Sequence, residues 1–454
     1  MNADQQARAL VAEAALAVDP RAQALLLAQA VCRSFRSVEG DLGRDLGTAL
    51  AALDGQPDEV CRFVWLAGGG LVAFRRFDPQ ARSGMLAATR SYNASLAAHP
   101  ECVELMLLAT ICTYEPERAG DLAAEPLRSG TLTASTACEV LTLAGAGDAW
   151  AGFLVRGETM LAEAVTLAAV AGEVEVEGQA SALLAKVLAF RGDLAGADAG
   201  LARARRLAAD SGSDYVAHGV VECAVPVEFV RGDLSSWRGL LDLLVSEGGG
   251  TVSGLASEYT LELATALLLE GDAAGRALAE ALPDPPDEVP GSVVARSWRR
   301  WLLDMDDPDA HADLVRATHL SSQPSAWTLR ARAAWLLSDH LSHGEAAQAR
   351  TLVELAARTY TAAGASGLFD ALARRTPHLL GVSEHLRLAT ARGEPDLTTA
   401  ERVVADALRE GLSNREIADR AHVSVKTVEF HLSNIYRKLG VRGRTELVVR
   451  LTGE

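Results

Sequence analysis

Four side chains near the C-terminus share one face of a predicted helix and have the chemistry to contact nucleic-acid bases. Lys426, Glu429, Phe430 and Ser433 follow one another at intervals of three, one and three residues, and residues three or four apart lie on the same side of a helix. A lysine can donate to guanine or phosphate, a glutamate can accept from cytosine, a phenylalanine can contact the thymine methyl group, and a serine can bond either way. These four residues are therefore candidates for base readout in DNA.

Seven further residues around this face carry groups that bond phosphate oxygens. Hydroxyl, amide, imidazole, guanidinium and ammonium groups all do so, as do the backbone amides of helix N-termini. Two alternatives stay open: Phe430 could pack against a partner or a neighbouring helix, and His431 could be a structural hydrogen-bonding group at the helix surface. The candidate phosphate contacts are Ser424, Thr427, His431, Asn434, Arg437, Lys438 and Arg442.

Capping signals predict the first two helices that position these side chains. Thr398 with Glu401, and Ser413 with Glu416, have the spacing of capping boxes, and Gly411 marks the end of the first helix. The second helix is short. Residues expected to face inward are Val403, Val404, Ala407 and Leu408 in the first helix, and Ile417, Ala418 and Ala421 in the second, which runs from Asn414 to about Arg420.

A third helix is predicted from Ser424, its N-cap, to Leu439, where Gly440 ends it. Its apolar residues step by three, four, three and four, which is the pattern of one buried stripe. Two helices joined by a short turn form a helix-turn-helix, whose second helix lies in the major groove. The predicted buried stripe consists of Val425, Val428, Leu432, Ile435 and Leu439.

The segment that begins at Leu397 resembles the DNA-binding domain of LuxR-type transcriptional regulators. The resemblance implies a sequence-specific transcriptional regulator that binds double-stranded DNA as a homodimer, with RNA polymerase as a further partner if the protein is an activator. Gly443 stands where the family has a serine, threonine or asparagine cap, and glycine costs only about a few tenths of a kcal/mol there. The matching residues are Leu397–Thr398, Glu401–Arg402, Gly411, Ser413–Ala418, Val423–Ser424, Lys426–Val428, His431, Ile435, Lys438–Val441, Arg444 and Glu446–Leu447.

A fourth helix, from Arg444 to Leu451, resembles the dimerisation helix of that family. The resemblance therefore makes Val448, Val449 and Leu451 candidates for the dimer interface or for the domain core.

Residues 1–390 are predicted to form an all-α solenoid of helical hairpins that resembles tetratricopeptide repeats. Alanine and leucine dominate, and apolar residues recur at intervals of three and four. Turn signals recur with a mean spacing of 38 residues, which indicates about nine hairpins. Residues 391–396 are the predicted linker to the DNA-binding domain at 397–454. The turn signals are Gly40–Asp41, Asp78–Pro79, Gly120–Asp121, Gly157–Glu158, Gly192–Asp193, Gly232–Asp233, Gly271–Asp272, Asp307–Pro308 and Gly344–Glu345.

Such an array offers a concave surface for a peptide, a protein or a small inducer, although it could also be a plain scaffold. The order of array and DNA-binding domain resembles the C-terminal half of the large ATP-binding, MalT-like LuxR regulators. The chain has only three lysines, Lys186, Lys426 and Lys438, and none follows a glycine, so a P-loop is excluded. We expect either a short member without nucleotide control or a coding start farther upstream.

No cofactor, metal or catalytic site is predicted. His340 and His343 lie about one helical turn apart, but no further ligand is spaced to complete a metal site. No carboxylate pair, serine elbow or Cys/His set has the pattern of an enzyme site. Six scattered cysteines are predicted to be buried, reduced thiols: Cys32, Cys61, Cys102, Cys112, Cys138 and Cys223.

The charge of −17 at first argues against a nucleic-acid partner, but it is unevenly distributed. Residues 396–454 hold ten basic and nine acidic side chains, whereas the first 395 residues carry −18. Within 424–450 the basic residues number six and the acidic residues two. The sequence therefore predicts that the acidic array stays away from phosphate and that the C-terminal module meets DNA. The alternative function is a solenoid interaction scaffold with an idle DNA-binding domain.

We expect the protein in the cytoplasm. The longest stretch without polar side chains, Phe63–Phe74, is 12 residues, which is too short to span a membrane. The N-terminus also lacks the features of a secretory signal.

Overall fold

The computed structural model consists of helices and their connections throughout the residues that it describes. It confirms the all-α prediction for this part of the chain. The described residues are 3–376 with gaps at 37–41, 76–77, 79–80, 114, 233–234, 238, 241–260, 262–263, 266, 269–270, 283–291, 321–325 and 342–345, followed by 404–405, 407–408, 412–421, 425, 428, 432, 435, 443–444 and 446–447.

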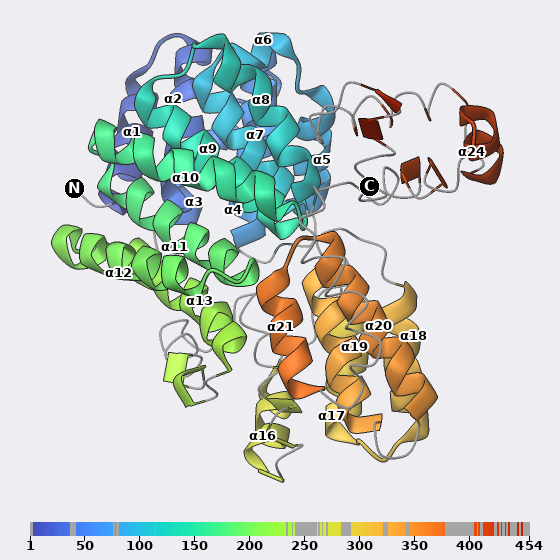
Figure 1. The fold of residues 1–454 in the computed structure, drawn as a ribbon. Coiled ribbons are helices and arrows are strands. Elements are labelled where there is room, and N and C mark those ends of the chain that lie inside the picture. The colour runs from blue at the N-terminus through green and yellow to red at the C-terminus, as the bar shows by residue number, and fades with distance from the viewer. Residues whose placement is uncertain are drawn as a thin grey trace.

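The first part of the chain is a stack of antiparallel helices (Figure 1). Most successive helices pack on each other, and several also contact helices farther along, as α11 contacts α9, α12 and α13. This confirms the helical-hairpin solenoid. Its elements are α1 (Ala3–Leu16), α2 (Pro20–Ser34), α3 (Leu42–Ala51), α4 (Glu59–Arg75), α5 (Ala81–Ser91), α6 (Ala94–Ala97), α7 (Pro100–Cys112), η1 (Pro116–Arg118), α8 (Ala119–Ser129), α9 (Ala134–Trp150), α10 (Leu154–Ala171), α11 (Val174–Phe190), α12 (Leu194–Ser211) and α13 (Asp214–Arg231).

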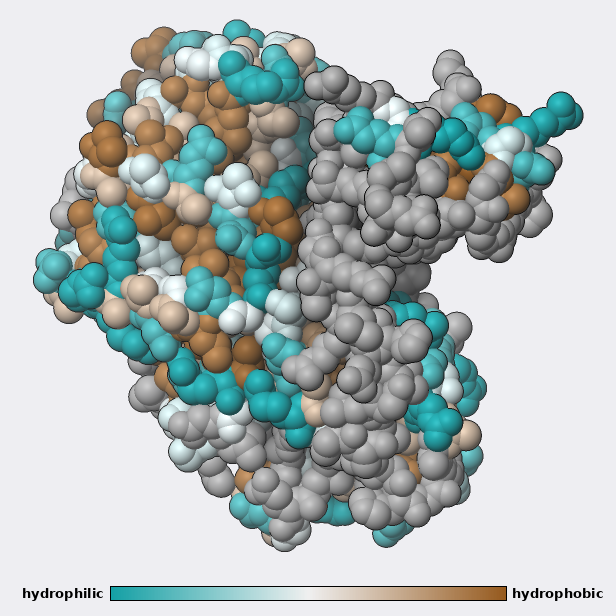
Figure 2. Space-filling model, in the orientation of Figure 1, coloured by the Kyte–Doolittle hydropathy of each residue, from teal (hydrophilic) through white to brown (hydrophobic). Residues whose placement is uncertain are grey.

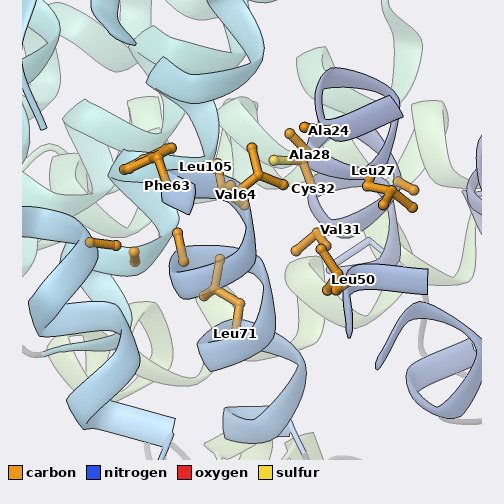
Figure 3. Packing of buried hydrophobic residues seen from close by; sticks show 14 of the residues in the cluster. Ala24, Leu27, Ala28, Val31, Cys32, Leu50, Phe63, Val64, Leu71 and Leu105 are labelled. Atoms are coloured by element: carbon orange, nitrogen blue, oxygen red, sulfur yellow. The ribbon is translucent and has the colours of Figure 1, made fainter. Parts of the chain in front are cut away.

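Small and branched apolar side chains fill the core between α2, α3 and α4. Leu27 and Val31 of α2 lie against Leu50 of α3 and Leu71 of α4, with Phe63 nearby (Figure 3). All five side chains are almost completely buried. Burial of each large side chain contributes roughly 1.5–3 kcal/mol. On the outside, hydrophilic and hydrophobic residues are interspersed over the visible face (Figure 2).

Glycines with positive φ end helices at nearly constant intervals. Between residues 130 and 232 they occur every 20 to 22 residues, once for each helix, because a helix C-terminus often needs a left-handed residue. Gly192, Gly232 and Gly271 confirm predicted turn signals. The sequence pattern did not mark the other helix-ending glycines of this stretch, which are Gly130, Gly152, Gly172 and Gly212.

Two predicted turn signals are wrong, because Gly120 and Gly157 lie inside the first turns of α8 and α10. A Cβ atom on Gly157 would come 2.8 Å from the carbonyl oxygen of Gly145 in α9, and one on Gly120 would come 2.6 Å from the Asp148 carboxylate. Glycine at these positions permits close helix packing. Asp78 and Asp307 do lie between helices, and Pro308 is the first residue of α18. Gly40–Asp41 and Gly344–Glu345 lie outside the described residues.

Later helices return to the array (Figure 1). The hairpin of α19 and α20 is followed by α21, which packs against both α11 and α13. The elements of this part are α16 (Ala274–Ala281), α17 (Ser292–Leu303), α18 (Pro308–Leu320), α19 (Trp327–Leu341), α20 (Ala346–Ala362) and α21 (Ser366–Arg375).

Side chains of the returning part cap the C-terminal ends of three array helices. The indole Nε1 of Trp327 donates to the carbonyl oxygen of Trp150, the last residue of α9, at 3.0 Å. The hydroxyl of Ser366 donates to the carbonyl of Arg191 after α11. The guanidinium of Arg374 donates to the carbonyl of Val230 in the last turn of α13. Terminal carbonyls have no partner within their own helix, so these contacts join the two parts of the chain.

A buried ion cluster joins α2, α7 and α9. Arg33 lies 2.8 Å from a carboxylate oxygen of Glu139, and Arg36 contacts both Glu139 and Glu104. Burial and the adjacent Glu139 raise the pKa of Glu104 to about 8. Burial alone would raise the pKa of Glu139, but Arg36, a hydrogen bond from Glu104 and Arg33 together lower it to about 2. The cluster therefore holds a proton on Glu104 at neutral pH.

Five of the six cysteines are buried and Cys112 is half-buried, so the buried-thiol prediction is confirmed for five. Burial raises the pKa of all six thiols and keeps them protonated. In the described part of the chain, no three His, Cys, Asp or Glu side chains gather as metal ligands. His340 and His343 contribute no described side chain. No described helix is long and apolar enough to span a membrane.

Because α21 packs closely against α11, the stability of the protein should be sensitive to substitution of Gly367. A Cβ atom there would overlap the carbonyl oxygen of Ala189 and approach the backbone of Gly192. We expect Gly367→Ala to destabilise the protein by about 1–3 kcal/mol, since backbone cannot move aside cheaply. Gly69 in α4 has open space at its Cβ position, so Gly69→Ala should be neutral or stabilise by up to about 1 kcal/mol. Thermal unfolding of both variants measures the difference, and equal shifts would contradict the close packing of α21.

The ion cluster predicts a pH dependence of stability. Because the folded state retains the Glu104 proton while the unfolded chain releases it, the free energy of unfolding should fall as pH rises from about 4.5 to about 8. The slope is at most about 1.4 kcal/mol per pH unit. Glu104→Gln should flatten this slope, whereas the exposed control Glu163→Gln should leave it unchanged. Unfolding curves at pH 5, 6.5 and 8 test this, and identical slopes in all three proteins would contradict it.

Candidate nucleic-acid interface

The described C-terminal residues form one small apolar core that is separate from the clusters of the array. Its members come from four stretches of sequence that were expected to be four helices. Each is less than 5% exposed. They are Val404, Ala405, Ala407 and Leu408 in the first stretch, Ile417 and Ala418 in α24 (Asn414–Ala421), Val428, Leu432 and Ile435 in the third, and Leu447 in the fourth.

A reciprocal capping box starts α24. The Ser413 backbone amide donates to the Glu416 carboxylate at 2.7 Å, and the Glu416 amide donates to the Ser413 hydroxyl oxygen at 3.4 Å. The Ser413 hydroxyl also donates to that carboxylate. These bonds lower the pKa of Glu416. The second predicted capping box is thereby confirmed, and the observed bounds of α24 agree with the prediction to within about one residue.

Arg444 connects the fourth stretch to the start of α24. Its guanidinium donates to the carbonyl oxygen of Leu412 at 2.6 Å and to Oδ1 of Asn414 at 3.2 Å. The amide of Leu447 donates to the carbonyl oxygen of Gly443, which places Gly443 at the beginning of a helical turn. Sequence reasoning gave Arg444 no structural role. The sequence signal for this residue is that Arg444 is among those that match the family pattern.

The third stretch has the predicted buried face, with one correction. Val428, Leu432 and Ile435 are buried and helical, at the spacing of four and three that one helix face requires. Val425 was expected in the same stripe but is 40% exposed. Side chains in the first turn of a helix point back toward its N-terminus, and there Val425 extends past the small core. Leu439, Val403 and the side chain of Ala421 lie outside the described residues.

None of the candidate contact residues belongs to the described part of the chain, and their assignments stay predictions. This holds for the base-readout residues, the phosphate contacts and the dimerisation residues. They are Lys426, Glu429, Phe430 and Ser433; Ser424, Thr427, His431, Asn434, Arg437, Lys438 and Arg442; and Val448, Val449 and Leu451.

Residues 395–451 match the family described as bacterial regulatory proteins, luxR family. The spore germination protein GerE of Bacillus subtilis is 43% identical over 60 residues, which are 13% of this chain and 81% of GerE. A Mycobacterium bovis protein named as an HTH-type transcriptional regulator is 48% identical over 62 residues, 14% of this chain. The chain spans only 7% of the length of that relative.

One relative is similar over a longer stretch. GfsR of Streptomyces halstedii, named as an HTH-type transcriptional regulator, is 33% identical over 153 residues, 34% of this chain and 52% of GfsR. A stretch of that length extends well outside residues 395–451. Among solved structures, the apo form of RapI matches with a TM-score of 0.39 and 10% identity, covering 75% of this chain and 85% of RapI.

The hydrogen bonds of Arg444 should stabilise the start of α24 against local unfolding. Arg444→Ala should speed amide hydrogen exchange in residues 412–421 by roughly tenfold or more, because hydrogen bonds from a charged group contribute about 1.5–3 kcal/mol. Arg415→Ala is the control, since that side chain is exposed on α24 and should leave exchange unchanged. Hydrogen exchange of the full chain, read by mass spectrometry, compares the two. Equal exchange would mean that Arg444 does not hold the start of the helix.

Proposed function

The chain belongs to the LuxR family of bacterial regulatory proteins, and we propose that it regulates transcription by binding DNA through residues 397–454. The observation that carries this proposal is the C-terminal core. Its buried residues come from all four predicted helical stretches, and the family match covers the same segment. Residues 1–390 are then the array, and 391–396 the linker.

The buried face of the third stretch supports the assignment of its opposite face to DNA. Because Val428, Leu432 and Ile435 are buried in the core, the helical period leads us to expect the residues between them on the other faces of one helix. In a helix-turn-helix the exposed face lies in the major groove, with its N-terminal half against the base edges. Lys426, Glu429, Phe430 and Ser433 are the proposed base-reading residues. The proposed phosphate contacts fix the orientation on the duplex.

We propose that the protein binds DNA as a dimer through its fourth helix. Leu447 is buried in the domain core, which leaves the following residues Val448, Val449 and Leu451 as candidates for a partner subunit. A two-fold symmetric dimer reads two half-sites, so its preferred site is a pseudo-palindrome. RNA polymerase is a further partner if the protein is an activator.

The charge distribution supports different functions for the array and the C-terminal domain. The first 395 residues carry −18 and residues 424–450 carry +4. Phosphate repels the acidic array, while the basic segment gains affinity from counterion release. The array is proposed to bind an effector or a protein partner. In the competing function, a scaffold with an idle DNA-binding domain, the array would bind partners without any DNA selection.

Selection from random duplexes tests DNA recognition. The full chain should enrich a pseudo-palindromic sequence. Lys426→Ala and Glu429→Ala should each alter preference at a base position, with a cost of about 1–3 kcal/mol for the favoured site. Lys438→Ala should instead weaken binding to all sequences and lower the salt slope by about one.

Arg205→Gln on α12 is a matched control, because it removes an exposed positive charge far along the sequence from the proposed interface. It should change neither sequence preference nor salt slope. If both the full chain and the 391–454 segment fail to enrich any sequence, the regulator proposal is wrong and the scaffold function gains support. Enrichment by the segment alone would indicate that the array masks the interface.

A further inference from the structure

Val425 is an exposed apolar side chain at the start of the third stretch. It is 40% exposed, whereas Val428, Leu432 and Ile435 farther along the stretch are buried. Of the large apolar residues that the structure describes after position 376, Val425 is the one that is exposed. The small C-terminal core therefore leaves part of this valine open to another contact.

The helical period places Val425 between the buried face and the face proposed for DNA. Consecutive residues of a helix are about 100° apart, so Val425 lies about 60° from Val428 in one direction, and Glu429 is expected about 40° away in the other. Residues four apart are neighbours on a helix surface. Val425 is therefore expected beside Glu429, a proposed base-reading residue, and one turn closer to the start of the helix.

The first turn of this helix is the part that a helix-turn-helix brings nearest to the bases. In this motif the N-terminal residues of the second helix contact the base edges. Val425 is helical, and the preceding Ser424 is the predicted N-cap. Side chains in the first turn point back toward the N-terminus of their helix. The exposed methyl groups of Val425 are therefore directed to the same end of the helix as the base contacts.

A valine side chain can recognise one kind of group in the major groove. It has no hydrogen-bond donor or acceptor, so it cannot pair with the nitrogen and oxygen atoms of the base edges. The apolar group that the major groove displays is the C5-methyl group of thymine. The chemistry of Val425 therefore fits a thymine and none of the other three bases.

The position of Val425 along the helix fits a base other than the one proposed for Glu429. One helical turn advances by about 5.4 Å, and successive base pairs are about 3.4 Å apart. In a helix that lies along the groove, a residue one turn before Glu429 reaches a base one or two pairs farther on. Val425 and Glu429 can therefore contact separate positions of one half-site.

We propose that Val425 determines specificity by contacting the methyl group of one thymine in each half-site. The proposal rests on the proposed function as a DNA-binding regulator and adds a residue to its base-reading set. The sequence pattern had placed Val425 in the buried stripe. Its exposure in the structure is the observation that assigns it to the interface instead.

Replacement of thymine by deoxyuridine in the selected duplex tests the contact, because it removes the C5-methyl group and keeps every hydrogen-bonding group of the base. Each thymine is replaced in turn, and the affinity of the full chain is measured. At one thymine position in each half-site, deoxyuridine should lower the affinity by about fourfold, the usual effect of one buried methyl group. Affinity of the Val425→Ala variant should no longer depend on that methyl group, because this variant lacks the two methyl groups of valine.

Three further variants show whether the effect belongs to Val425. Val425→Thr keeps one methyl group and should keep part of the response to deoxyuridine. Phe430→Ala should leave the response at that thymine unchanged, although Phe430 is itself a candidate for a thymine at another position. Val155→Ala is the matched control, because Val155 is the second residue of α10 and is 38% exposed. It should keep the full response.

Unfolding temperatures of the variants test the alternative that Val425 packs against protein. Val425 and Val155 are similarly exposed, so both alanine variants should unfold at nearly the same temperature. If Val425→Ala unfolds at a clearly lower temperature than Val155→Ala and still responds fully to deoxyuridine, Val425 contacts protein and the proposal is wrong.

The outcomes separate this proposal from the proposed function. A full chain that enriches a sequence without thymine, or that loses no affinity with deoxyuridine, would contradict the role of Val425 and leave DNA recognition intact. An equal response of the unsubstituted chain and Val425→Ala would do the same. A full chain that enriches no sequence would contradict both proposals.

Discussion

The structure depends on hydrogen bonds that cap three helix C-termini from far along the chain. The donors on Trp327, Ser366 and Arg374 lie 144 to 177 residues after the carbonyl groups that they bond. Alternate helices of a hairpin array point the same way, so α9, α11 and α13 present their C-terminal ends along one edge. An uncapped carbonyl that is removed from water costs about 1–3 kcal/mol. The returning helices supply the missing donors and pack their own apolar residues at the same edge.

This junction gives the array a property that a simple solenoid lacks. In a solenoid each repeat contacts only its neighbours, and a change in one repeat affects distant ones weakly. Here Trp327 of α19 caps α9, so the position of one array helix depends directly on a helix far along the chain.

In the C-terminal part, a few hydrogen bonds join the stretches that surround one small apolar core. The capping box of Ser413 and Glu416 fixes the start of α24, and Arg444 attaches the fourth stretch to the same point. Small domains bury a small fraction of their surface and are marginally stable, so such bonds matter more here than in the array. They fix the start of α24 and attach the fourth stretch to it.

The sequence by itself determined the local features: the helical period, the Ser413–Glu416 cap, the inward face of Ile417, Val428, Leu432 and Ile435, and the family. These follow from contacts within about four residues, which spacing reveals. Gly120 and Gly157 were mistaken for turns, because a glycine needed for positive φ and one needed for close packing look alike in sequence. The exposure of Val425, the role of Arg444 and the return of α21 to α11 and α13 depended on tertiary structure. The bonds that hold α21 join residues up to 175 positions apart, and no local pattern specifies which distant donor will meet a helix end.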